Sequence, residues 1–159
     1  SLNQWALDFE GNAQRILQSI KEAKAGDASL RIGPELEITG HGIRDCCPFH
    51  AIPSRSGTGF ACPSEKELYM TDLPFPRLCL DHFLESDTDK HAWESLVSLL
   101  QNPVCNDILL DFGMPVVHKN VKYNARIITF NQEILLIRPK LHLANDGNYR
   151  EMRYYMHIF

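Results

Sequence analysis

Two carboxylates and one lysine stand where strands of this chain are expected to end. The stretch GPELEITG holds Glu35 and Glu37 behind the short, mostly apolar run 30–32, and IRPK holds Lys140 after Pro139. A carboxylate can act as a general base, and a fixed ammonium can stabilise the negative charge that develops during acyl transfer. Most such charged residues are solvated or form ion pairs instead. The sequence therefore names Glu35, Glu37 and Lys140 as candidates for catalysis, with ordinary ion pairing as the alternative.

Two helices are predicted from the spacing of apolar residues. In RILQSIKEA these residues recur on one helical face, which predicts a helix over about 10–25 that ends near Gly26. The same spacing in AWESLVSLL predicts a second helix over about 89–101, before Pro103. These helices would supply one apolar layer of the fold.

Strands are predicted over 30–34, 107–117, 121–130 and 133–140, and the last two of these runs are rich in β-branched and aromatic residues. Only Asn131 and Gln132 separate the last two runs, which predicts a hairpin. Two helices interleaved with four strands favour an α/β sandwich over an all-α or all-β fold. In this arrangement Glu35 and Lys140 each lie just past a strand end, where a rigid backbone can present a side chain to a cleft.

The composition indicates an ordinary globular domain. The chain has 159 residues, is 44% hydrophobic and carries a net charge of −4, enough for one domain with its own core. Because it is acidic and shows no basic cluster interleaved with aromatics, we expect no nucleic-acid partner. No run of about 20 apolar residues and no signal-peptide layout occurs, so we expect neither membrane insertion nor secretion. Five cysteines, an odd number, favour a reducing compartment.

Residues 43–78 fit none of these patterns. They hold five of the nine prolines and show no sustained period, so we interpret them as a mobile or disordered insertion, with translated non-coding sequence as our hypothesis for its origin. A rival hypothesis is a zinc-binding knuckle, whose ligands would come from the set Cys46, Cys47, His50, Cys62, Cys79 and His82. The irregular gaps between these residues do not match the usual paired-cysteine spacing.

Four stretches together resemble a known family: LNQWALDFEGN, GPELEITG, GMPVVHKNVKYNARIITF and EILLIRPKLHLANDGNYRE. They are similar to nitrilase-like amidohydrolases, and more closely to the N-terminal glutaminase domain of eukaryotic glutamine-dependent NAD synthetases. The resemblance covers residues 2–42 and 79–154. It implies a partial nitrilase-like α-β-β-α sandwich over residues 1–159 that hydrolyses the amide of glutamine through a cysteine thiolate.

The resemblance also implies roles for individual residues. Glu35, directly after the proline, matches the base of the family, and Lys140 matches the cation that stabilises the oxyanion. Glu37, which would point to the same side as Glu35 on an extended backbone, is interpreted as a supporting or structural carboxylate. Glu151 is a candidate second carboxylate near the site, and His41 is a candidate for the substrate pocket.

The sequence departs from the family at the nucleophile. The family places its catalytic cysteine downstream of the lysine, but all five cysteines here precede Lys140. Cys105 is interpreted as a buried residue that packs in the core. We therefore expect the chain alone to be inactive, with a generic amidase or a non-catalytic truncated product as alternatives. We also expect apolar edges of the sheet beside the hairpin to be uncovered, which favours aggregation.

The remaining implications concern partners and location. The resemblance implies glutamine as the small-molecule substrate, a cytoplasmic location and a homo-oligomer for a longer parent protein. It implies no cofactor for the glutaminase part, whereas ATP and magnesium would serve a separate synthetase domain that makes NAD from its deamido precursor.

Overall fold

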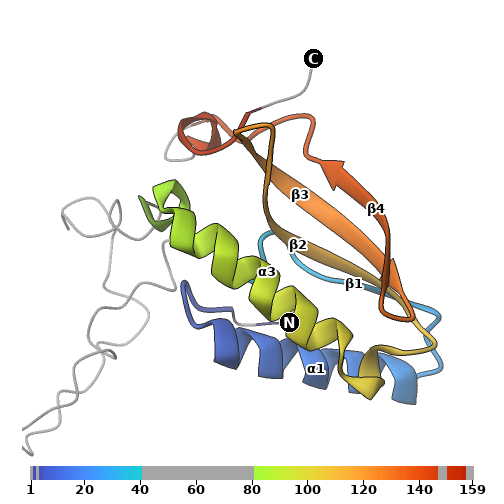
Figure 1. Ribbon diagram of the computed structural model, residues 1–159. Coiled ribbons are helices and arrows are strands. Elements are labelled where there is room, and N and C mark those ends of the chain that lie inside the picture. Colours follow the sequence, from blue (N-terminus) through green and yellow to red (C-terminus); the bar gives the residue numbers. More distant parts are fainter. Residues whose placement is uncertain (1, 3, 41–80, 147–149, 157–159) are drawn as a thin grey trace, which may run out of the picture.

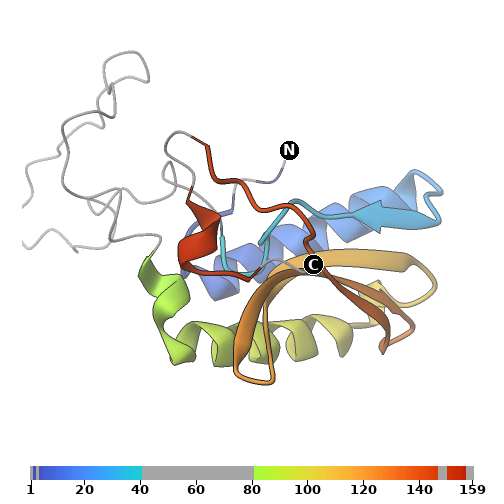
Figure 2. The same ribbon diagram turned by 90° about the horizontal axis from the view of Figure 1, so that it is seen from above.

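The computed structural model describes residues 2, 4–40, 81–146 and 150–156. Their architecture is mixed α/β, with one four-stranded sheet and two helices along the same side of it (Figures 1 and 2). The α/β class expected from the sequence is thereby confirmed. The interpretation of 43–78 as an insertion falls outside the described residues.

The two helices lie close to their predicted positions. Helix α1 spans Phe9–Ala25, and the carboxylate of Asp8 caps it by accepting a hydrogen bond from the Gly11 amide at 3.1 Å. It stops at Gly26, as expected. Helix α3 spans Ser86–Leu100 and begins earlier than expected, because its first turn is polar and shows no apolar spacing. Three short 3-10 helices also occur among the described residues: η2 (Asp81–Leu84), η3 (Pro103–Cys105) and η4 (Glu151–Arg153).

The sheet has the order β1-β2-β3-β4. Its strands are β1 (Leu30–Ile32), β2 (Leu109–His118), β3 (Val121–Phe130) and β4 (Glu133–Pro139). Strand β1 runs parallel to β2, and the other pairs are antiparallel. The hairpin predicted at Asn131 and Gln132 is confirmed, and both residues adopt the positive φ that a two-residue hairpin turn requires.

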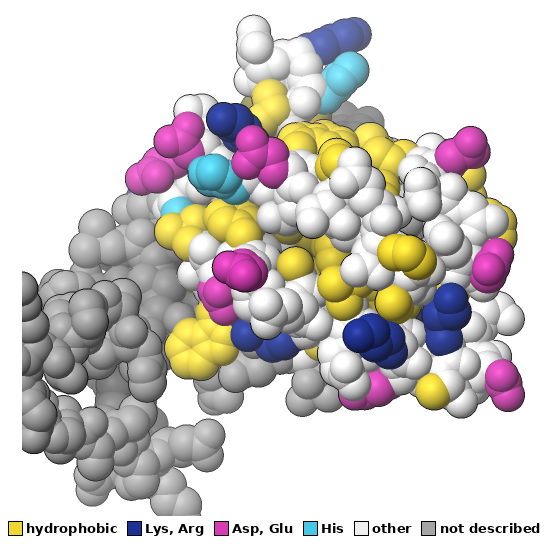
Figure 3. Space-filling view, turned by 60° about the horizontal axis from the view of Figure 1, so that its bottom comes forward, with side chains coloured by type: hydrophobic (Ala, Val, Ile, Leu, Met, Phe, Trp, Pro, Cys, Tyr) yellow, Lys and Arg dark blue, Asp and Glu magenta, His cyan; other side chains and the backbone are white. Residues whose placement is uncertain are grey.

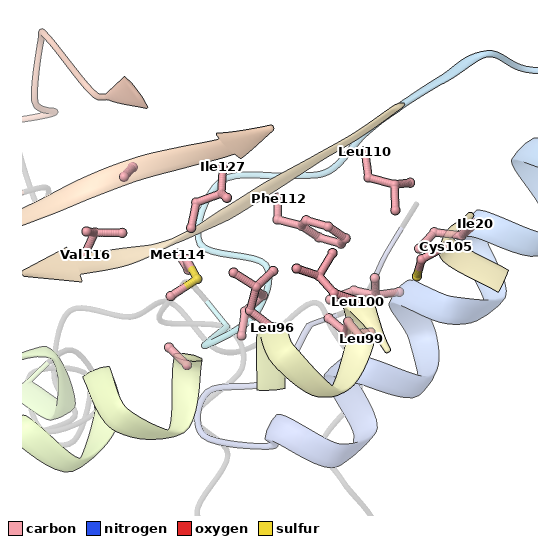
Figure 4. Packing of buried hydrophobic residues seen from close by; sticks show 14 of the residues in the cluster. Ile20, Leu96, Leu99, Leu100, Cys105, Leu110, Phe112, Met114, Val116 and Ile127 are labelled. Atoms are coloured by element: carbon pink, nitrogen blue, oxygen red, sulfur yellow. The ribbon is translucent and has the colours of Figure 1, made fainter. Parts of the chain in front are cut away.

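The main core lies between the sheet and the two helices. Leu110 and Phe112 of β2 point toward Leu96 and Leu99 of α3 and toward Ile20 of α1 (Figure 4). Because strand side chains alternate between faces, the residues between them point to the other face of the sheet. That second face, which we call the open face, bears the polar residues of the candidate site.

Strand β4 forms an exposed edge of the sheet. Four consecutive apolar residues, Ile134–Ile137, are each between 41% and 57% exposed. This agrees with the expected uncovered edge, while the expected aggregation stays a prediction. On the face seen in Figure 3, acidic and basic side chains are interspersed among apolar ones. Among the described helices, none is both long and apolar enough to cross a membrane.

Candidate active site

The loop that follows β1 carries Glu35 across the open face. It is held to β2 by backbone hydrogen bonds, from the Gly33 amide to the Asp111 carbonyl at 2.9 Å and from the Ile38 amide to the Gly113 carbonyl at 3.3 Å. The loop turns sharply at Leu36, whose φ is +50°. Strand β1 thus ends at Ile32, and Glu35 lies just beyond it, as predicted.

Gly113 leaves room for this loop. A Cβ atom added there would lie 2.5 Å from the Leu36 amide nitrogen and 2.7 Å from the Pro34 carbonyl oxygen. Since both contacts are with backbone, a larger residue has to push the loop off the strand. The glycine therefore determines how closely the Glu35 loop approaches β2.

We expect Gly113→Ala to lower the free energy of unfolding by about 1–3 kcal/mol, the usual cost of overpacking. Gly26→Ala is the matched control, because its Cβ would meet only the Ala23 and Glu22 carbonyl oxygens at ordinary distances of 3.5 and 3.6 Å. Urea denaturation of both variants measures the difference. Equal stability of the two variants would mean that the loop does not press on Gly113.

Arg126 of β3 anchors the same loop from the other side. Its guanidinium donates to the Gly33 carbonyl at 2.7 Å and to the Pro34 carbonyl at 3.1 Å, and its Nε pairs with Asp111 at 2.9 Å. Both carbonyls belong to residues directly before Glu35. Arg126 thus fixes the backbone from which the Glu35 side chain extends.

Lys140 joins two carboxylates on the open face. Its Nζ donates to Glu35 Oε1 at 2.8 Å and to Glu151 Oε2 and Oε1 at 2.9 and 3.2 Å. Glu151 is 5% exposed and also accepts the Ala144 amide at 2.6 Å, whereas Lys140 and Glu35 are partly open to solvent. The structure therefore brings Lys140 and Glu151 together with Glu35, which precedes Lys140 by 105 residues.

Asn124 was missed by sequence reasoning. Its side-chain amide donates to Glu35 Oε1, and its backbone carbonyl accepts the Lys140 amide at 2.7 Å. The signal available in the sequence was the alternation in NARIITF, where Asn124 and Arg126 interrupt an apolar run with period two. That alternation places both side chains on the open face.

The contacts shift the ionisation of the two groups in opposite directions. Burial opposes the charged form of Glu35, but the hydrogen bond and charge of Lys140 outweigh it, so the pKa of Glu35 lies below its ordinary value of 4.5. Burial likewise opposes the charged form of Lys140, but its bonds to Glu35 and Glu151 raise the pKa of Lys140 above 10.5. At neutral pH the site is an ionised carboxylate beside a fixed ammonium.

The site opens into a cavity of about 460 Å³. Its lining consists of Glu35, Asn124, Arg126, Arg138, Pro139, Lys140, Leu141 and His142. Within the described ranges, no group of three or more His, Cys, Asp or Glu side chains could hold a metal ion. Of the residues in the zinc-knuckle hypothesis, only His82 belongs to the described part, so the knuckle stays a hypothesis about residues outside it.

Glu37 lies in a different environment from Glu35. It is completely buried and forms a bidentate ion pair with Arg31 of β1, at 2.9 and 2.8 Å. The expectation that both carboxylates point to the same side was wrong, because the backbone between them turns through Leu36 instead of staying extended. Burial raises the pKa of Glu37, and the Arg31 guanidinium opposes this shift.

Cys105 packs in the main core, as expected. Burial raises the pKa of its thiol to about 11, which keeps it protonated and unreactive at neutral pH. The other four cysteines and His41 lie outside the described residues, so the pocket role expected for His41 stays a prediction.

Comparison with known proteins agrees with this fold. The family model for carbon-nitrogen hydrolases matches residues 1–157. The glutamine-dependent NAD(+) synthetase of Saccharomyces cerevisiae is 48% identical over 155 residues, which cover 98% of this chain and 17% of that protein. The chain thus spans about a sixth of the length of that relative.

Two solved structures extend the comparison. A glutamine-dependent NAD(+) synthetase from Cytophaga hutchinsonii matches with a TM-score of 0.72 and 25% identity, over 99% of this chain and 20% of that one. An amidase of the nitrilase superfamily from Nesterenkonia matches with a TM-score of 0.62 and 13% identity, over 99% of this chain and 46% of that one. The nitrilase-like fold expected from the sequence is thereby confirmed. The chain belongs to the carbon-nitrogen hydrolase family.

Proposed function

We propose that this chain supplies the base and the oxyanion-stabilising cation of a glutamine amidohydrolase. In a longer parent protein, this site would provide the ammonia that converts deamido-NAD to NAD. The observation that carries the proposal is Lys140, whose Nζ contacts both Glu35 and Glu151 at the open cavity. The similarity to glutamine-dependent NAD(+) synthetases supports glutamine as the substrate.

The chemistry follows from the charges at the site. Glu35 takes the proton of a cysteine thiol, and the thiolate attacks the carbonyl carbon of the glutamine side-chain amide. Negative charge then moves to the former carbonyl oxygen, where the Lys140 ammonium stabilises it. As the carbon–nitrogen bond breaks, Glu35 returns the proton to the leaving ammonia. Water then attacks the thioester, so that glutamate is released and the thiol restored.

The thiol in this scheme is assigned by resemblance to the family. A related amidase has a cysteine in its active site, to which acrylamide adds. Cys105 does not fit the role, because it is buried in the apolar core with a raised pKa. We propose that the nucleophile comes from a part of the parent protein that follows Lys140 in sequence.

Further parts of the proposal concern the setting of the reaction. We propose a cytoplasmic protein that needs neither nucleic acid nor a membrane, and a homo-oligomer for the longer parent. The hydrolysis needs no cofactor, and ATP and magnesium are assigned to a separate synthetase domain. The mixed charges in Figure 3 support the absence of a nucleic-acid surface on that face.

The test places this chain in front of the remainder of the Saccharomyces cerevisiae relative, joined where the similarity ends. We expect this chimera to release ammonia and glutamate from glutamine, and to act poorly on acetamide. Lys140→Met should lower kcat by about 10²–10³-fold, the usual loss for an oxyanion donor. Lys90→Met is the control, since Lys90 is exposed and pairs only weakly with Glu94 at 3.7 Å.

Two results would count against the proposal. Equal rates for the Lys140→Met and Lys90→Met chimeras would remove Lys140 from the mechanism. Preference for acetamide over glutamine would favour a generic amidase. We expect residues 1–159 alone to release no ammonia above background, and turnover by this chain alone would show that one of its own cysteines acts as the nucleophile.

A further inference from the structure

The two oxygens of Glu35 have different surroundings. Oε1 accepts a hydrogen bond from Asn124 Nδ2 and another from Lys140 Nζ, the latter at 2.8 Å. Neither of these two donors contacts Oε2. Because a carboxylate oxygen has two lone pairs in its plane, two donors occupy the accepting directions of Oε1.

Asn124 is held firmly in this position. It lies within β3, is 2% exposed and pairs with Pro115 of β2 in the sheet. Its own carbonyl accepts the Lys140 amide at 2.7 Å, so one residue contacts both the base and the cation. Asn124 therefore links β3 to the Glu35 side chain and to the backbone of Lys140.

We propose that Asn124 is a positioning residue for Glu35: with Lys140 it occupies Oε1 and leaves Oε2 as the oxygen that receives the thiol proton. This inference rests on the proposed function. In the step, the S–H bond breaks, an O–H bond forms at Oε2, and the electron pair stays on sulfur. No other reactant is needed.

The type of side chain matters to this role. A neutral amide donates to the carboxylate without adding a charge, so Lys140 stays the only cation in hydrogen-bond contact with Glu35 among the described residues. A second ammonium there would lower the basicity of Glu35 further, and a carboxylate would repel it. Arg126, the neighbouring cation on β3, is occupied by Asp111 and by the carbonyls of Gly33 and Pro34.

The first test uses the unsubstituted chain of residues 1–159. A pH titration by NMR follows the Glu35 carboxyl carbon, assigned by its loss in Glu35→Gln, together with the side-chain amide protons of Asn124. We expect both signals to shift with one midpoint below 4.5, the ordinary value for Glu35. Asn124 amide protons that do not respond to the Glu35 titration would overturn the inference.

The second test compares variants of the same chain. Asn124→Leu should move the Glu35 midpoint upward, and the isosteric Asn124→Asp should move it further because a second carboxylate repels the charge. Asn106→Leu, in the turn after η3, is the matched control and should leave the midpoint unchanged. Amide dispersion shows which variants fold, and an unchanged Glu35 midpoint in any folded Asn124 variant would overturn the inference.

The third test measures catalysis in the chimera described above. The free energy of a hydrogen bond to a charged group corresponds to a change of roughly 10- to 100-fold in a rate constant. Asn124→Leu should therefore lower kcat by that factor, with KM changed by less than about twofold. A rise in KM at constant kcat would assign Asn124 to substrate binding and overturn the inference. Inactivity of the unsubstituted chimera would instead overturn the proposed function, while the two NMR tests still decide the contact with Glu35.

Discussion

Glu35→Gln in the chimera is expected to lower kcat for glutamine by about 10²–10⁴-fold, the usual contribution of a general base. The amide of glutamine fills the same space and still accepts a hydrogen bond from Lys140, but it cannot take a proton from the thiol. A coupled assay for ammonia measures the rate. Glu94→Gln is the control, because Glu94 is exposed and lies on α3, away from the open face.

The pH dependence adds a second signature of Glu35. Its pKa lies below 4.5, because the hydrogen bond and charge of Lys140 outweigh burial, so more than half of Glu35 is still ionised at pH 4.5. The rate of the chimera should therefore fall to half of its plateau only at a pH below 4.5. A decline that begins near pH 7 would indicate a different base.

The pKa shifts of Glu35 and Lys140 also make the free energy of unfolding depend on pH, and the direction of each shift determines whether stability is lost at low or at high pH. A lowered pKa means that ionised Glu35 stabilises the fold above pH 4.5 and that this contribution is lost as the pH falls through the folded-state pKa. A raised pKa means that charged Lys140 stabilises the fold below pH 10.5 and that this contribution is lost as the pH rises through its folded-state pKa. The ion pair thus contributes fully between these two values.

Arg31→Met is expected to lower the free energy of unfolding by about 3–5 kcal/mol, the cost of leaving one partner of a buried ion pair alone. Arg31 and Glu37 are 6% and 0% exposed, and their two hydrogen bonds join β1 to the loop that carries Glu35. Arg31 Nε also donates to Ser19 of α1 at 3.0 Å. Urea denaturation at neutral pH measures the loss.

Two comparisons distinguish the contribution of this ion pair to stability from that of the packing of the two side chains. The double variant Arg31→Met with Glu37→Met should recover much of the lost stability, because no buried charge is then left unpaired. The loss in the single variant should also shrink as the pH falls, since protonated Glu37 carries no charge. Lys90→Met, which removes an exposed pair, should change stability by less than about 1 kcal/mol. A pH-independent loss in Arg31→Met would contradict the electrostatic explanation.

Local patterns in the sequence predicted most elements of the fold. The apolar spacing before Gly26 and the β-branched runs on either side of Asn131 and Gln132 encode their structures within a few residues, so α1 and the hairpin were found from the sequence. The start of α3 at Ser86 was missed, because a polar first turn carries no apolar spacing. Positions after strand ends named Glu35, Glu37 and Lys140 as candidates, and the family resemblance then favoured Glu35 over Glu37 as the base.

The details of the site depend on contacts between distant segments. Glu35 and Glu37 point to different environments because Leu36 between them has a positive φ. The residue types in GPELEITG do not predict that backbone conformation. The role of Asn124 depends on strand register, which sets it opposite Pro115 and beside the Glu35 loop. Such contacts are properties of the assembled sheet, and a single sequence does not reveal them.

The parallel pairing of β1 with β2 has a consequence for the order of folding. The antiparallel pairs β2–β3 and β3–β4 are hairpins, which form in about 1–10 μs, whereas a parallel pair must first close a long loop and forms more slowly. The contact between Glu35 and Lys140 spans 105 residues and depends on that late pairing. We therefore expect the hairpins to form before the site, so that the low pKa of Glu35 is acquired only when the parallel pair has closed.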